Sequence, residues 1–177
     1  MPSQSWVALM PSMPSADGTA LANSVTLTAI SPLPDVTIPA NFLAVGSRLR
    51  ITAAGRYSTT ATPTLNWGLY YGGVGGVAAG VTGAITLPTT VTNLTWSLDA
   101  TLTVRTAGSA GTGLVTGSVT YGSSATASLS VMIPSSAPAT FVCDTTTAKT
   151  LVLGATWGTA NAANTLQVHE WLIESMA

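Results

Sequence analysis

Apolar and small polar residues alternate along much of this chain, and this two-residue period is the feature that most limits how it can fold. The clearest run is 94–104, where every second side chain from Leu94 to Val104 is apolar and the others are Thr, Ser or Asp. Successive side chains of a β-strand point to opposite faces, whereas a helix buries a stripe with a period of 3.6 residues. The run therefore predicts a strand with one buried and one exposed face.

Similar runs recur along the chain and are separated by Gly, Pro, Ser and Thr. They lie at 25–29, 48–57, 65–71, 85–87, 115–121, 129–133, 141–143, 151–157 and 165–175. Many short strands with a turn about every dozen residues are typical of two-sheet sandwiches and jelly rolls. We therefore expect an all-β, jelly-roll-like sandwich of about eight to ten antiparallel strands.

The composition agrees with an all-β fold. The chain of 177 residues contains 30 Thr, 26 Ala, 18 Ser and 17 Gly, but only 5 Lys plus Arg and 6 Asp plus Glu. Long charged helix formers are scarce, and the length suits one domain. We expect residues 23–177 to form that single jelly-roll domain. Residues 1–22 carry Pro2, Pro11 and Pro14 and show no period, so they predict an extended N-terminal arm.

Several functional classes are disfavoured by the scarcity of charge and of metal ligands. A net charge of −1 leaves no basic patch for nucleic acid or an anionic membrane. The lone cysteine, Cys143, and the lone histidine, His169, cannot build a disulfide framework or a closed zinc site. The uncharged runs 57–98 and 106–143 are interrupted too often for a spanning helix, and no Lys or Arg precedes Arg48 to start a secretory signal. We expect no cofactor, metal, nucleic-acid or membrane partner, and synthesis in a cytoplasm.

No catalytic constellation is marked in the sequence. A Ser or Cys nucleophile needs a base within hydrogen-bond reach, and the sole imidazole, His169, adjoins Glu170 on a strand, which predicts that the two point to opposite faces. A triad of His169 with Cys143 or a serine stays open, but a packed histidine and a buried structural thiol are the favoured interpretations. The acidic residues that could pair for glycoside hydrolysis are Asp35, Asp99, Asp144, Glu170 and Glu174. Nothing marks any pair of them, so we expect no enzyme, and a hydrolase is only a remote alternative.

Two strands carry candidate interface residues. Arg48, Arg50 and Arg56 share one face of their strand, where they could form ion pairs with Glu170 and Glu174 or meet an acidic partner. In the last strand, simple alternation places His169, Trp171 and Ile173 on one apolar face. The opposite face carries Leu166, Val168 and Leu172. A strand that is apolar on both faces must be covered by its own core on one face and by a neighbouring molecule on the other. The face with His169, Trp171 and Ile173 therefore predicts an interface between copies, and we expect a homotrimer.

The N-terminal arm is a further candidate contact. Trp6, Leu9, Met10 and Met13 are apolar, yet the prolines and the lack of period give them no place in a helix or a half-buried strand. We expect the arm to dock on another protein rather than to complete its own core.

Three stretches resemble small β-rich virion proteins of tailed bacteriophages that infect actinobacteria. They are NFLAVGSRLRITAAGRYSTTATPTLNWGLYYGG (41–73), LTWSLDATLTVRTAGSAGTG (94–113) and LVLGATWGTANAANTLQVHEWLIESMA (151–177). The resemblance implies a jelly-roll subunit displayed on the virion, and a trimer similar to the tumour-necrosis-factor-type jelly rolls. It carries no functional residues over to this chain.

The expected function is that of a virion structural protein. A head decoration or minor capsid protein would bind the major capsid protein or another virion protein of the phage head as an oligomer and stabilise the head. A surface with few charges suits packing against identical copies. The alternative is a tail or spike module that binds host-surface glycan. Exposed aromatic side chains around a shallow groove would distinguish that alternative.

Overall fold

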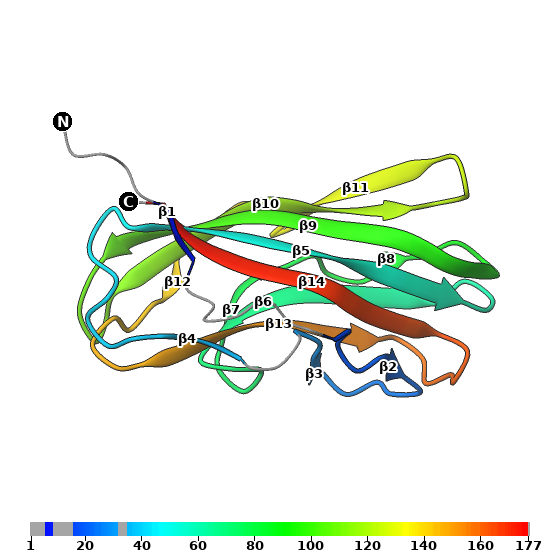
Figure 1. Cartoon of the computed structure of the whole chain (residues 1–177), viewed down its shortest axis with the longest axis horizontal. Helices are drawn as coiled ribbons and strands as arrows, with labels where there is room; N and C mark the ends of the chain where they lie inside the picture. The colour runs from blue at the N-terminus through cyan, green and yellow to red at the C-terminus, as the bar shows by residue number, and fades with distance from the viewer. Residues whose placement is uncertain (1–5, 9–15, 32–34, 177) are drawn as a thin grey trace.

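The computed structural model describes residues 6–8, 16–31 and 35–176 and shows a sandwich of two β-sheets (Figure 1). The strands are β1 (Trp6–Ala8), β2 (Leu21–Ala22), β3 (Thr28–Ala29), β4 (Val36–Ile38), β5 (Arg48–Thr59), β6 (Thr64–Tyr71), β7 (Val77–Val81), β8 (Ile85–Thr86), β9 (Val91–Thr106), β10 (Thr112–Gly122), β11 (Ser128–Ile133), β12 (Phe141–Val142), β13 (Lys149–Trp157) and β14 (Thr165–Met176). None of the described segments forms a helix that could cross a membrane. The fold is all-β, as the alternation predicts.

The strand order is that of a jelly roll. The larger sheet runs β1-β14-β5-β9-β10-β11, with β2 also paired to β14 and β12 to β10. The smaller sheet runs β3-β13-β6-β7, with β4 on β13 and β8 on β6. The chain passes back and forth between the two sheets. Its last strand, β14, lies between β1 and β5 in the larger sheet, as in the double Greek key of a jelly roll. The strands β10, β11 and β12 extend the larger sheet beyond β9.

The core lies between the sheets and is built by the predicted alternation. In β9 every second side chain from Trp96 to Val104 is buried. Trp67 of the smaller sheet meets this row, with its ring centre 6.0 Å from that of Trp96 and 6.1 Å from that of Tyr121. Tyr57 adds an edge-to-face contact with Tyr121 at 6.5 Å. The inward aromatic residues of the alternating runs therefore form the centre of one core.

The beginning of the chain contributes to this same domain. Backbone pairing joins Trp6–Ala8 to the end of β14 and Leu21–Ala22 to its beginning. Leu21 is buried, and its carbonyl accepts a hydrogen bond from Trp157 Nε1 at 3.2 Å. These contacts differ from the expectation of an arm that stays apart from its own core. Of the residues expected to dock elsewhere, Trp6 supplies backbone to β1, and Leu9, Met10 and Met13 lie outside the described residues.

Candidate functional site on the larger sheet

The centre of the outer face of the larger sheet is covered by short, neutral side chains. Because the apolar side chains of β9 point into the core, its remaining side chains, including Thr95 and Ser97, point away from it. Thr120 of β10 and Ala54 of β5 lie in the rows beside them, since Thr120 pairs with Ser97 and Ser97 with Ala54. These central rows therefore present hydroxyl and methyl groups, and the charged side chains of Asp99 and Glu170 lie beside them.

Three adjoining hollows mark this face. The largest, about 510 Å³, is lined by residues of β5, β9, β10, β11 and β14, among them Ser97, Thr120 and Ser128. A second, about 340 Å³, shares Ala54, Ser97 and Glu170 with it. The third, about 420 Å³, shares Thr95, Gly122 and Ser128 and lies against the β10–β11 turn. Together they form a shallow groove across the sheet, which we call the hydroxyl groove.

A β-bulge in β14 places two titratable side chains on the rim of the hydroxyl groove. The register with β5 shifts between Val168 and Glu170, so one residue, His169, is inserted at this point. His169 and Glu170 then both line the largest hollow, and His169 Nδ1 lies 2.6 Å from Asp17 Oδ1. The expectation that neighbours on a strand point to opposite faces is wrong here because the bulge interrupts the alternation.

The same bulge corrects the expected interface on β14. Beyond it, Trp171 and Ile173 turn inward and are 1% and 0% exposed in the isolated chain. They join Leu166 and Val168, which are buried before the bulge. A second copy therefore has no access to Trp171 or Ile173, and of the three predicted interface residues only His169 reaches the surface.

The arginines of β5 lie beside the hydroxyl groove. Arg50 Nη2 donates to Asp99 Oδ2 at 2.8 Å, and this hydrogen bond is the main reason that the pKa of Arg50 is raised. Both side chains are largely exposed, so the pair contributes little to stability. Arg56 donates to Gln167 Oε1 at 3.1 and 2.9 Å instead of meeting an acid. Arg48 is exposed opposite Thr103 and Met176.

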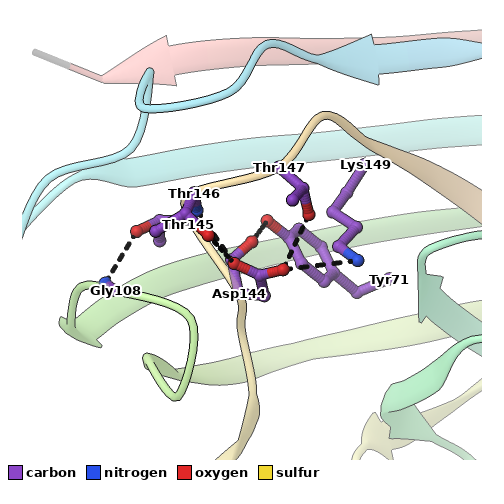
Figure 2. A network of polar contacts seen from close by, with 7 residues as sticks. All are labelled: Tyr71, Gly108, Asp144, Thr145, Thr146, Thr147 and Lys149. Carbon is purple, nitrogen blue, oxygen red and sulfur yellow. Dashed lines mark hydrogen bonds and ion pairs between the residues drawn. The ribbon is translucent and has the colours of Figure 1, made fainter.

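A second polar network holds a loop at one end of the sandwich (Figure 2). Asp144 accepts hydrogen bonds from the Thr146 backbone N–H at 2.9 Å and from the Thr146 and Thr147 hydroxyls at 2.7 Å each. The Asp144 carbonyl accepts from the Tyr71 hydroxyl at 2.8 Å, and Lys149 Nζ lies 3.5 Å from the carboxylate. Every donor belongs to this loop or to the strands beside it. The network therefore fixes the loop's shape.

The pH dependence of this network tests its geometry. The Thr147 hydroxyl, followed by the Thr146 hydroxyl and backbone N–H, holds the pKa of Asp144 well below its usual range. Folding thus favours the ionised carboxylate, and its contribution to stability is present above the usual aspartate pKa and is lost as the pH falls through the lowered value. We expect Thr147→Ala to raise the Asp144 pKa in an NMR titration. The matched change Thr140→Ala, at an exposed threonine outside the network, should leave it unchanged.

Cys143 has the properties of a structural thiol. It is 0% exposed, and burial raises its pKa, so the protonated form dominates at neutral pH. Its backbone N–H donates to Gly111 O, next to the β9–β10 turn, whereas His169 lies beside the middle of β5. The structure therefore does not bring Cys143 and His169 together. Among the described residues, no group of three or more His, Cys, Asp or Glu could hold a metal ion.

Comparisons of the chain with protein-family models, with curated proteins and with solved structures found no match.

Proposed function

We propose that the protein is a virion structural protein, a capsid decoration or minor capsid protein that binds a phage head as a homo-oligomer and stabilises it. The observation that carries the proposal is the centre of the outer face of the larger sheet, where Ala54, Thr95, Ser97 and Thr120 present small neutral groups. Short side chains lose little rotamer freedom when a partner covers them, and none of these four carries a charge that must be desolvated. The resemblance of residues 41–73 to phage virion proteins points to the same function.

A binding experiment on particles tests this proposal. Ser97 lies at the centre of the hydroxyl groove and is exposed, so Ser97→Lys should keep the fold while adding a charge that a partner would bury. We expect this variant to bind capsids that lack the protein at least about tenfold more weakly than the unchanged chain, because an unpaired buried charge costs several kcal/mol. Ser136→Lys, at an exposed serine outside the groove, is the control. Equal binding of both variants would contradict a contact through this face.

The alternative, a module that binds host-surface glycan, is favoured by one observation. Hydroxyl groups, His169 and Glu170 line a groove that is large enough for a few sugar rings. Yet the tryptophans and tyrosines of residues 16–31 and 35–176 are all buried, so none of them offers a ring for a sugar to stack on. Titration with cell-wall glycans separates the two functions. Binding that is lost in Glu170→Gln would support the glycan module.

A further inference from the structure

The strand β11 forms an unprotected border of the larger sheet. In the described part of the chain it pairs only with β10, and Figure 1 shows it as the outermost strand of that sheet. Its sequence, SLSVMI, contains no charge, proline or glycine, and its register with β10 has no bulge. Proteins usually guard such borders with charges, prolines, bulges or very short strands. The border β7 of the smaller sheet follows that rule, since its pairing with β6 is interrupted by a register shift.

The pairing pattern shows which backbone groups of β11 do not bond to β10. At the β10–β11 turn, Ser123 N donates to Ala127 O at 2.7 Å, and the register continues without a shift through Gly122 opposite Ser128. Hydrogen-bonded and non-hydrogen-bonded pairs alternate along an antiparallel ladder. Leu129 and Val131 therefore bond to β10. The N–H and C=O groups of the residues between them, Ser128, Ser130 and Met132, point away from it.

The side chains of β11 lack cover as well. Leu129 lies opposite Tyr121 and so faces the core side of the sheet, yet it is 53% exposed. Met132 on the other face is 62% exposed. Both apolar side chains lie on the strand whose outward backbone groups have no partner within residues 6–8, 16–31 and 35–176. The strand therefore offers both hydrogen bonds and apolar area to one partner.

We propose that two copies of the chain pair antiparallel along β11, with Ser130 opposite Ser130 of the second copy. This register brings together the outward-pointing groups of Ser128, Ser130 and Met132 from both copies and forms about six backbone hydrogen bonds. It also sets each Leu129 opposite Val131 of the other copy, on the face where both are partly or fully exposed. A two-fold axis through Ser130 makes the strand complementary to itself, and neither copy brings a charge to the contact.

This pairing does not depend on the proposed function, because it is a property of the isolated protein and is measured without capsids. A cysteine cross-link tests the register. Opposite residues of a hydrogen-bonded pair have Cα atoms about 5.5 Å apart, a distance that a disulfide can span. We expect Ser130→Cys to form a covalent dimer under mild oxidation. The native Cys143 is fully buried and gives no background, and Ser109→Cys, in an exposed loop at the other end, measures random collisions.

A second variant tests the backbone contacts. Ser130→Pro removes an N–H that points away from β10, so the β10–β11 ladder keeps its own hydrogen bonds. By light scattering across a concentration series, we expect this change to raise the dimer dissociation constant at least about tenfold. Ser109→Lys, in the exposed β9–β10 loop, should leave that constant unchanged. A monomeric mass for the unchanged chain at all concentrations would overturn the proposal. Cross-linking of Ser130→Cys no faster than that of Ser109→Cys would also overturn it, whether or not the proline variant folds.

Discussion

Replacing Trp96 with alanine is expected to lower the free energy of unfolding by about 3–5 kcal/mol, the range for deleting a buried tryptophan. The indole is 2% exposed and lies between the sheets beside Trp67. Its Nε1 donates to Gln167 O at 3.3 Å, so the side chain also connects β9 to β14 across β5. Alanine would leave a cavity and remove this hydrogen bond together.

Urea unfolding followed by circular dichroism measures this loss. The neighbour Ser97 points outward on the same strand, so Ser97→Ala is the matched control and should change stability by less than about 0.5 kcal/mol. The stability of Trp96→Phe should lie between those of Trp96→Ala and Ser97→Ala, because phenylalanine keeps most of the packing. Equal stability of Trp96→Ala and the control would mean that the core is not centred on this ring.

Adding a single methyl group at Gly55 is expected to lower the free energy of unfolding by about 3 kcal/mol, which is the upper part of the range for overpacking. A Cβ atom at this position would overlap the Gln167 carbonyl oxygen and come within 2.9 Å of Trp96 Nε1. The carbonyl belongs to the backbone next to the β14 bulge and cannot move without disturbing the pairing of β5 with β14. Gly55→Ala should therefore move the unfolding transition to a lower urea concentration.

The adjacent residue supplies the control for this experiment. Ala54→Ser adds one atom at a partly exposed position on the outer face, and we expect nearly unchanged stability. If Gly55→Ala unfolds at the same urea concentration as Ala54→Ser, the close approach of Trp96 to β14 across Gly55 is wrong.

Alternation predicts the strands that are regular along their whole length. The run 94–104 was recognisable because one strand supplies both the buried row and the outward row, and no other part of the chain is needed to interpret it. The β14 strand was different. Its two halves bury residues of opposite parity, Val168 before the bulge and Trp171 after it, and only pairing with β5 determines where the extra residue sits. A bulge leaves no mark in the alternation of a single strand that is apolar on both faces.

The hydroxyl groove could be predicted only in part. Its chemistry is visible in the sequence, since outward Thr and Ser residues such as Thr95, Ser97 and Thr120 recur on several strands. Its shape depends on which strands are neighbours, and strand order does not follow from alternation. Likewise, the pairing of His169 with Asp17 joins two segments that are far apart in the chain, so neither residue alone indicates the contact.

The position of β14 between β1 and β5 has a consequence for how the chain reaches its folded state. Residues 48–58 of β5 pair with residues 165–176 of β14. Because β14 follows all the other strands in the sequence, β5 can pair with it only after the ribosome has synthesised every other strand. Contacts between such distant segments require the closure of a long loop, which slows folding. Until β14 docks, β5 is a bare sheet border open to other chains. Arg48, Arg50 and Arg56 line its outer face, and charges at a border oppose aggregation during that interval.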